Sequence, residues 1–313
     1  MALATSALAT YAAIGNREDL SDMIYNISPT DVPFLTSIGR GTADATLHEW
    51  QQDVLASASA SNQVLEGDEA TTDTTTPTTR IVNTCEIQDK VARVTGTQQA
   101  VKSAGRKDQL AYEIVKRAKE LRRDMETDLT SANARNAGNA TTARVSAGLE
   151  TWYFTNTTFG SGGSTTATVQ TAGAITGGTD VPLTEAVLKA SLASAWDAGG
   201  DPDCIMVGSN NKQVISGFTG NATRMKGAED KTLVAAVDIY DSDFGTLEIK
   251  PNRFQNATTV HILQTDMWEV AYLRPVRMSP LAKDGDSERK QILVEWTLVA
   301  KNQAASAAIF DRA

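Results

Sequence analysis

A long polar segment between two extended stretches constrains the fold of this chain more than any other feature. Residues 56–79 read ASASASNQVLEGDEATTDTTTPTT, and they separate the β-patterned stretches 44–55 and 80–95. Loops of this length inside a compact domain are usually functional or disordered. A two-stranded ribbon is also only marginally stable alone in water. The ribbon therefore needs a partner surface, from its own chain or from another copy.

Residues 80–95 have the alternation of extended chain. Alternate residues of a strand point to the same face of a sheet. The apolar residues that share one parity in this stretch are Ile81, Cys85, Ile87 and Val91. Polar Asn83 and Asp89 interrupt this parity. The pattern therefore predicts an extended stretch.

Residues 106–130 show the clearest helical periodicity in the chain. Apolar residues recur there at spacings of three and four, at Leu110, Ile114, Ala118, Leu121, Met125 and Leu129. This spacing predicts one narrow apolar stripe on a long, largely exposed helix that ends at 136–138. Two pairs, Glu113–Arg117 and Arg122–Glu126, have the i,i+4 spacing of ion pairs that contribute about 0.2–0.5 kcal/mol each.

The chain after residue 180 predicts a compact α/β segment followed by strands. Thr184 and Ser209 are placed to cap two helices, and Gly199 and Gly200 stop the first of them. Residues 219–232 are expected to form an open loop. The expected strands are 204–208, a hairpin of 234–240 with 246–251, then 260–263, 269–273 and the long 289–302.

Composition favours a folded chain with an acidic surface. Of the 313 residues, 41% are hydrophobic and 21% are charged, and the formal net charge is −9. Such a chain can form a real core. It is not built to coat itself in nucleic acid, because that affinity comes mainly from Lys and Arg. The two cysteines, Cys85 and Cys204, are expected to be buried free thiols.

The N-terminal region has no pattern of a secreted or membrane-bound chain. Residues 1–19 are small and apolar but lack the basic region of a signal peptide. No apolar run approaches the ~20 residues that span a bilayer, so we expect no membrane partner. Residues 17–39 predict a short helix and a second turn, broken by Pro29 and Pro33.

The sequence offers no pattern typical of catalysis or metal binding. Its two histidines, His48 and His261, have no Cys or carboxylate at ligand spacing. Nucleophile-elbow, zinc-protease and phosphate-loop motifs do not occur. One cluster of acidic residues consists of Asp238, Asp241, Asp243 and Glu248. It is more typical of a solvated hairpin turn than of a calcium-binding loop, because calcium ligands are missing and the glycine is misplaced. We therefore expect no enzyme activity, no catalytic or cofactor-binding residues, no cofactor and no metal.

The long helix carries the one large group of basic residues, namely Arg106, Lys107, Lys116, Arg117, Lys119, Arg122 and Arg123. One interpretation is a solvated face that pairs partly with Asp108, Glu113 and Glu120. The other is a face that meets an acidic surface or packaged nucleic acid. Three parts of the chain expose surface that another protein chain could bury: the ribbon, the N-terminal arm and this helix. Such surface is typical of a subunit of an assembly.

Three parts of the chain carry a resemblance to a known family. They are REDLSDMIYNISPTDVPFLTSIGR (17–40), TLEIKPNRF (246–254) with TDMWEVAYLRP (265–275), and PLAKDGDSERKQILVEWTLVAKN (280–302). Over about residues 15–312 the chain resembles the major capsid proteins of tailed bacteriophages, whose fold is named for phage Hong Kong 97 (HK97). The resemblance implies an α+β, HK97-like capsid fold. Its parts would be an N-arm (1–43), an extended β-ribbon loop or E-loop (44–101), a long spine helix with the start of the peripheral domain (102–180), an axial domain (181–251), and strands that return mainly to the peripheral domain (252–313).

The resemblance also implies a function and partners. The chain would self-assemble through pentamers and hexamers into the icosahedral shell that encloses the double-stranded DNA genome of a tailed phage. Its partners would be other copies of itself, a portal protein, a separate scaffolding protein, a decoration protein and DNA contacted non-specifically on the inner face. Its locations would be the virion and, before assembly, the host cytoplasm. The alternatives are a nanocompartment shell protein that encloses a protein cargo and a non-viral, adhesin-type structural protein.

The extended loop, the helix and the axial tip supply the expected contacts between subunits. The tip is expected in the 219–232 loop. Some members of this fold cross-link subunits through a lysine on the extended loop, but residues 41–89 contain no Lys, and the nearest are Lys90 and Lys102. We therefore expect a noncovalent join. The candidate contact residues are Trp50, Glu66, Asp68, Glu69, Arg80, Arg106, Arg117, Arg122, Arg224 and Lys226.

Overall fold

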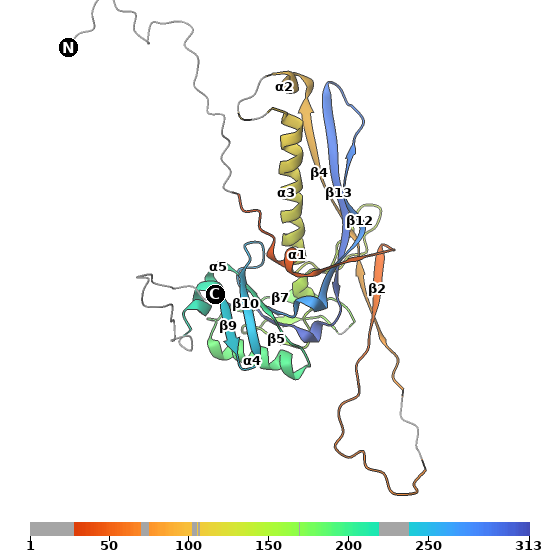
Figure 1. Ribbon diagram of the computed structural model, residues 1–313, viewed down its shortest axis with the longest axis vertical. Helices are drawn as coiled ribbons and strands as arrows, with labels where there is room; N and C mark the ends of the chain where they lie inside the picture. The colour runs from red at the N-terminus through yellow and green to blue at the C-terminus, as the bar shows by residue number, and fades with distance from the viewer. Residues whose placement is uncertain (1–27, 70–74, 102–104, 106, 169, 219–237) are drawn as a thin grey trace, which may run out of the picture.

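The described chain consists of a long helix on a four-stranded sheet, a six-stranded sheet with two shorter helices, and a loop that projects from both (Figure 1). The computed structural model describes residues 28–313 except 70–74, 102–104, 106, 169 and 219–237. The mixture of helix and sheet confirms the predicted α+β class. Several sequence predictions lie outside the described residues, namely the helix before Ser28, the 219–232 loop, the start of the hairpin at 234–237, and the contacts of Arg106, Arg224 and Lys226.

The four-stranded sheet has the order β1-β12-β13-β4. Its strands are β1 (Gly39–Thr42), β12 (Trp268–Pro280), β13 (Ser287–Ala300) and β4 (Glu86–Thr95). Strand β1 is parallel to β12, and the other neighbours are antiparallel. Gly285, with a φ of +70°, lies in the turn that joins β12 to β13. The predicted strands at 269–273 and 289–302 are confirmed, and β12 continues well beyond the expected end.

Helix α3 (Gln109–Leu129) packs on this sheet with the predicted apolar stripe. Leu110, Leu121, Met125 and Leu129 are buried, and Asp108 caps the helix by accepting a hydrogen bond from the backbone N–H of Ala111 at 3.0 Å. The predicted end at 136–138 is wrong. The helix ends at Thr130, whose hydroxyl donates to the carbonyl of Glu126, and residues 136–145 form a hairpin-like loop instead.

The extended stretch predicted at 80–95 is confirmed, and it contains two strands that belong to two different sheets. Strand β3 (Thr79–Thr84) pairs with β2 (Leu47–Gln52), and β4 pairs with β13. Cys85 lies between them, and its backbone N–H donates to the carbonyl of Thr46 at 2.8 Å. The buried parity therefore changes after Cys85: Ile87 and Val91 are exposed, whereas Ala92 and Val94 are buried.

The six-stranded sheet has the order β5-β14-β11-β8-β10-β9. Its strands are β5 (Thr157–Thr158), β14 (Ala307–Ile309), β11 (Val260–Leu263), β8 (Cys204–Val207), β10 (Gly245–Pro251) and β9 (Ile239–Ser242). The predicted strands at 204–208 and 260–263 and the hairpin before 251 are confirmed, although residues 234–237 of the expected hairpin lie outside the described part. Residues 252–313 were expected to return mainly to the peripheral domain. Strands β12 and β13 lie in the sheet of α3, whereas β11 and β14 lie in the six-stranded sheet.

Two helices accompany the six-stranded sheet. Helix α4 (Glu185–Asp197) begins as predicted, because the Thr184 hydroxyl accepts a hydrogen bond from the backbone N–H of Val187. Helix α5 (Ser209–Ser216) differs from the prediction, since Gly208 is the capping residue and Ser209 is the first helical residue. The remaining short elements are α1 (Pro33–Ser37), α2 (Gly96–Ala100), β6 (Ser164–Thr165), β7 (Ile175–Thr176), and the 3-10 turns Leu149–Trp152, Thr265–Met267 and Gln303–Ala305.

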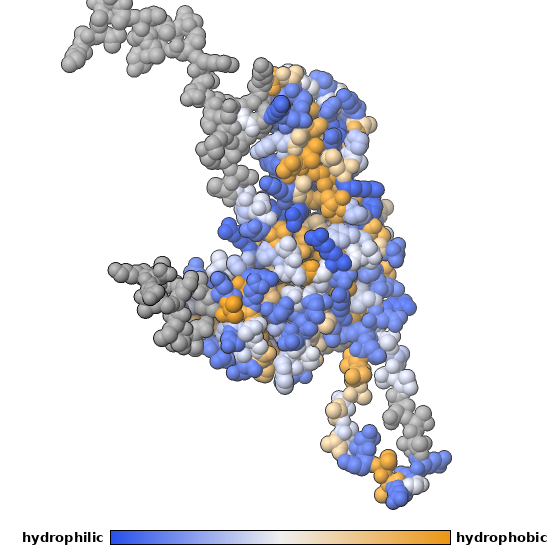
Figure 2. Space-filling model, viewed as in Figure 1, coloured by the Kyte–Doolittle hydropathy of each residue, from blue (hydrophilic) through white to orange (hydrophobic). Residues whose placement is uncertain are grey.

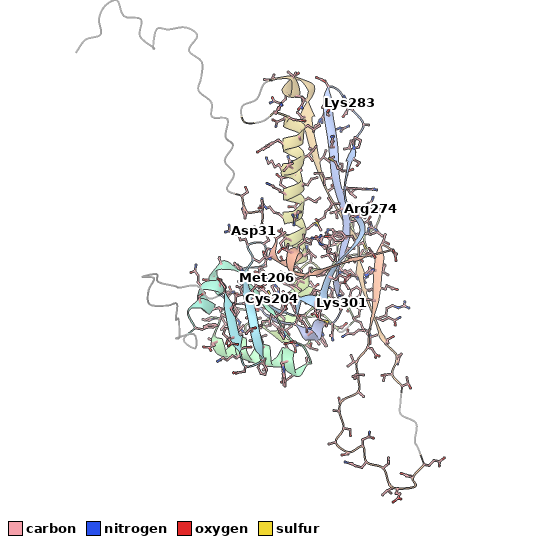
Figure 3. All side chains as sticks on the ribbon, viewed as in Figure 1. Asp31, Cys204, Met206, Arg274, Lys283 and Lys301 are labelled. Carbon is pink, nitrogen blue, oxygen red and sulfur yellow. The ribbon has the colours of Figure 1, made fainter. Side chains whose placement is uncertain are left out.

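Strand β8 joins the two sheets into one body because both of its faces are buried. Cys204 and Met206 belong to the core shared with α3, β12 and β13, whereas Ile205 and Val207 belong to the core under α4 and α5. Cys204 and Met206 accordingly lie at the centre of the molecule (Figure 3). Cys85 and Cys204 are both buried free thiols, as predicted. Among the described residues, no helix is both long enough and apolar enough to cross a membrane.

Candidate subunit interface

The loop between β2 and β3, residues 53–78, projects away from both sheets and exposes apolar side chains (Figures 1 and 2). Val54 and Leu55 are 69% and 92% exposed, and Val64 and Leu65 are 83% and 79% exposed. We call these four residues the apolar pairs. Each such side chain would be stabilised by about 1.5–3 kcal/mol if it were fully buried. The sequence analysis missed them, because they lie within a segment that is otherwise polar.

The tip of the loop is an acidic turn. The backbone N–H of Asp68 donates to the carbonyl of Leu65 at 3.1 Å, and Gly67 supplies the positive φ of +84° that this turn requires. Glu66, Asp68 and Glu69 are all exposed, and their contact with a neighbouring subunit stays a prediction. Residues 53–69 and 75–78 contain no Lys or Arg. The tip therefore offers carboxylates beside the second apolar pair.

The base of the loop is fixed to the body of its own subunit. The indole N–H of Trp50 donates to the carbonyl of Ala300 at 2.9 Å, and its ring lies 5.7 Å from that of Trp152. The Asn83 amide donates to the carbonyl of Leu298 at 2.7 Å and accepts from the backbone N–H of Ala147 at 3.0 Å. Trp50 thus anchors the ribbon within the chain, and its contact with a neighbour stays a prediction.

Arg80 lies on the outer surface of the ribbon. Its guanidinium is 3.5 Å from the carboxylate of Glu49 on the paired strand, and its side chain is 68% exposed. Within the subunit this arginine therefore pairs with Glu49. A pair between Arg80 and an acidic loop tip of another subunit remains a prediction. Such exposed pairs contribute only ~0–1 kcal/mol.

The two ion pairs predicted along the long helix are replaced by other contacts. Arg117 pairs with Glu120 at 2.6 Å, and Glu113 accepts a hydrogen bond from Gln109. Arg122 is exposed, whereas Glu126 is fully buried and its carboxylate accepts hydrogen bonds from Phe34, Leu35 and Asn252. The i,i+4 spacing makes the two residues neighbours on the helix, but these other donors occupy the carboxylate.

Glu126 connects the N-terminal arm to the helix, and the sequence analysis did not identify it. Its carboxylate accepts hydrogen bonds from the backbone N–H groups of Phe34 and Leu35, both at 2.8 Å, and from the Asn252 amide at 2.7 Å. Burial raises the pKa of Glu126, and these three donors oppose that shift. The carboxylate thereby satisfies the first N–H groups of α1, which has no side-chain cap of its own.

A basic groove runs along the exposed face of α3. It encloses about 110 Å³. Val115 is 56% exposed there, and Lys116 and Lys119 form no ion pair with any described residue. The guanidinium of Arg123 lies 5.5 Å from the ring of Phe254. The residues that line this basic groove are Ser28, Thr30, Tyr112, Val115, Lys116, Lys119, Glu120 and Arg123.

Buried charges elsewhere hold the body together. The carboxylate of Glu295, with a side chain only 4% exposed, pairs with Arg144 at 2.5 Å and with Arg274 at 2.6 Å. Arg274 lies on β12 (Figure 3).

His261 is fully buried, and burial lowers its pKa to about 3, so this imidazole is neutral at physiological pH. No group of three His, Cys, Asp or Glu residues in the described part is placed to hold a metal ion.

Known proteins of similar sequence and structure are viral capsid proteins. The family model "SU10 major capsid protein" matches residues 6–313. The major capsid protein of Escherichia phage Phieco32 is 26% identical over 341 residues, which cover 97% of this chain and 96% of that protein. These matches favour the phage capsid interpretation over a nanocompartment shell or an adhesin.

Solved capsid structures share the fold at low identity. The cyanophage A-1(L) capsid has a TM-score of 0.69 at 15% identity, covering 97% of this chain and 98% of that one. The capsid of a native GTA particle has a TM-score of 0.63 at 14% identity and covers 100% of both chains. These likenesses confirm the predicted HK97-like fold. Because the family model spans nearly the whole sequence, this chain belongs to the SU10 major capsid protein family.

Proposed function

We propose that this major capsid protein self-assembles through pentamers and hexamers into an icosahedral shell around the double-stranded DNA of a tailed phage. The observation that carries the proposal is the loop of residues 53–78, whose apolar pairs extend from a base fixed by Trp50 and Asn83. An isolated subunit leaves that apolar surface in water. A neighbouring subunit would bury it, and obligate interfaces commonly bury upwards of ~2,000 Å².

The parts of the fold take distinct roles in this proposal. Residues 1–43 act as the N-arm, and 44–101 act as the extended loop that lies over a neighbour. The spine helix and the start of the peripheral domain occupy 102–180, and the axial domain occupies 181–251. Residues 252–313 serve both sheets, since β11 and β14 pair beside β8 while β12 and β13 pair beside β4.

The proposed partners extend beyond the subunit itself. A separate scaffolding protein guides assembly, a portal protein occupies one vertex, and a decoration protein binds the outer surface. DNA contacts the inner face without sequence specificity. The net charge of −9 argues against a tight coating of the DNA by this chain. The protein is a virion component that resides in the host cytoplasm before assembly, and it has a structural role without catalysis.

Electron microscopy of particles that contain this protein tests the proposal. We expect closed icosahedral shells whose nucleic acid, after treatment with external nuclease, is double-stranded DNA. Shells that contain a protein cargo and no DNA would instead favour a nanocompartment. Soluble monomers at every concentration, with and without the other head proteins of the phage, would overturn the proposal.

A further inference from the structure

Residues 298–312, which we call the late segment, complete both sheets of the subunit. The ribosome synthesises this segment after every part of the chain that it contacts. It contains the end of β13 and all of β14. Strand β14 lies inside the six-stranded sheet, antiparallel to β11 on one side and parallel to β5 on the other. Strand β5 therefore joins this sheet only through β14.

The first part of the late segment fixes the base of the extended loop. The carbonyl of Ala300 accepts a hydrogen bond from the indole N–H of Trp50 at 2.9 Å. The side-chain oxygen of Asn302 accepts another from the amide of Gln52 at 2.8 Å. The amide of Asn83 likewise donates to the end of β13, at 2.7 Å. A chain whose late segment is not yet in place contains the loop but has no fixed base for it.

The second part, residues 306–312, is buried along its whole length. Its most exposed residue, Asp311, is only 7% exposed. The backbone N–H of Ala308 donates to the carbonyl of Asn156 at 2.9 Å. The ring of Phe310 stacks on that of Phe159, with 4.8 Å between the ring centres. Buried backbone groups need such partners, so the neighbouring strands cannot form a complete sheet before this part arrives.

The side chain of Asp311 holds the late segment in a socket lined by glycines. Its carboxylate accepts a hydrogen bond from the backbone N–H of Gly160 at 3.0 Å. A Cβ added to Gly163 or to Gly178 would lie 2.6 or 3.0 Å from the same carboxylate. Among the described residues other than glycine, Asp311 alone has a positive φ, +57°. A residue keeps that conformation only where surrounding contacts outweigh its cost, so the socket determines one pose for the segment.

We infer that the late segment delays assembly, because the subunit gains a fixed loop and closed sheets only after residues 298–312 have left the ribosome. Before that point the apolar pairs belong to a loop without a rigid base. A neighbour that bound such a loop would also have to order it, which weakens binding. This inference rests on the proposed function, since it concerns the time at which a subunit becomes able to assemble.

The two native thiols report on the two parts of the late segment. Cys85 is fully buried at the base of the loop, in a small apolar cluster with Val299. Cys204 is 1% exposed on β8, whose neighbour β11 pairs with β14. Burial raises the pKa of Cys85 to about 11 and that of Cys204 to about 12. Both thiols should therefore react slowly in the folded subunit and quickly when the late segment is absent from its place.

Ribosome-bound chains test the inference directly. In one chain, synthesis stalls directly after residue 313, so that the late segment stays in the exit tunnel. In the second chain, a flexible Gly/Ser linker after residue 313 carries the late segment outside. A maleimide should label the thiols of the first chain at least about tenfold faster than those of the second, which should match the released subunit. The variants Cys85→Ala and Cys204→Ala separate the two signals. Slow labelling of Cys85 in the first chain would overturn the inference, because the base of the loop would then form without the late segment.

A pair of proline substitutions tests the late segment in released chains. Ala308→Pro removes the donor to Asn156 inside the sheet, whereas the matched control Ala313→Pro changes an exposed residue. Cells that make Ala308→Pro together with the unmodified chain should yield shells in which mass spectrometry finds only the unmodified chain. Ala313→Pro should enter shells in proportion to its synthesis.

The outcomes of this co-expression separate the inference from the proposed function. Shells that contain Ala308→Pro in proportion to its synthesis would overturn the inference and leave the proposed function intact. Absence of shells from cells that make only the unmodified chain, with the other head proteins present, would overturn the proposed function itself.

Discussion

The base and the tip of the extended loop have opposite surroundings, although both belong to one continuous segment of the chain. At the base, Ile81 is 2% exposed and Asn83 is fully buried in a network of hydrogen bonds. In the projecting part of the loop, Leu55 and Leu65 are in water, and the described backbone there makes only local hydrogen bonds. The base is therefore stabilised by folding of the subunit, whereas the tip can be stabilised only by assembly.

This difference teaches that stability and assembly are carried by separable parts of the chain. The core side chains of the body, such as Trp152 and Trp268, are already covered, so they contribute to the free energy of unfolding. The apolar pairs contribute little to that free energy, and they are available to a neighbour. Substitutions at the base and at the tip should consequently change different measurements.

The largest expected effect comes from truncating the aromatic anchor under the base. Trp152 is 1% exposed and contacts Trp50, so Trp152→Ala should lower the free energy of unfolding by about 3–5 kcal/mol. Leu55→Ala should change it by less than ~0.5 kcal/mol, yet it should weaken shell assembly. Chemical denaturation of unassembled subunits and sedimentation of particles measure the two effects. Equal loss of subunit stability in both variants would contradict the separation.

A second comparison uses two asparagines of the same loop. Asn83→Ala removes the donor to Leu298 and the acceptor for Ala147, and it leaves buried backbone groups without partners. We expect a loss of about 1–3 kcal/mol in the free energy of unfolding. Asn62→Ala, at an exposed position of the loop, is the matched control and should leave the denaturation midpoint unchanged. A midpoint that shifts equally for both would mean that the base network does not stabilise the fold.

Part of the pH dependence of subunit stability should come from a buried carboxyl, that of Glu86. Burial, together with nearby Asp128, raises the pKa of Glu86 from 4.5 to about 9. Because the folded pKa is the higher one, the stability from this group is complete below about pH 4.5 and is lost as pH rises toward about 9. Glu86→Gln keeps an oxygen for the backbone N–H of Ser146, so it should raise Tm at pH 8 by about 2–4 °C and change it less at pH 5. A Tm at pH 8 that stays unchanged in Glu86→Gln would contradict the assignment.

The smallest effect is expected at the surface of the ribbon. Arg80→Ala breaks an exposed pair with Glu49, which should cost at most ~1 kcal/mol of subunit stability and less at high salt. Thermal unfolding at low and high salt measures this. A larger loss that persists in high salt would show that Arg80 has a buried role within the subunit.

Regular periodicity in the sequence predicted the long elements correctly. The spacing of apolar residues predicted the buried face of α3, because residues three and four apart lie on the same side of a helix. Alternation likewise predicted β13, which pairs with a strand on each side. In such elements many residues indicate the same secondary structure and the same buried face.

Tertiary contacts explain what the sequence did not reveal. The change of parity at Cys85 arises because the chain leaves one sheet for another, and no local pattern records that step. Glu126 is adjacent to the apolar stripe of α3. Its carboxylate is buried because the N-terminal arm packs there and donates two backbone hydrogen bonds to it, which the sequence alone does not show. The apolar pairs were visible in the sequence, but their exposure became evident only once the loop was placed away from both sheets.

The most direct test of the account is to remove the loop and keep its base. Gln52 and Thr79 are paired across the ribbon, so an Asn-Gly turn can replace residues 53–78 without changing the register of β2 and β3. We predict a subunit with an unchanged denaturation midpoint that forms no stable shells by electron microscopy. Normal shells from this variant would contradict the claim that the loop drives assembly, and an unfolded subunit would contradict the claim that folding is independent of the tip.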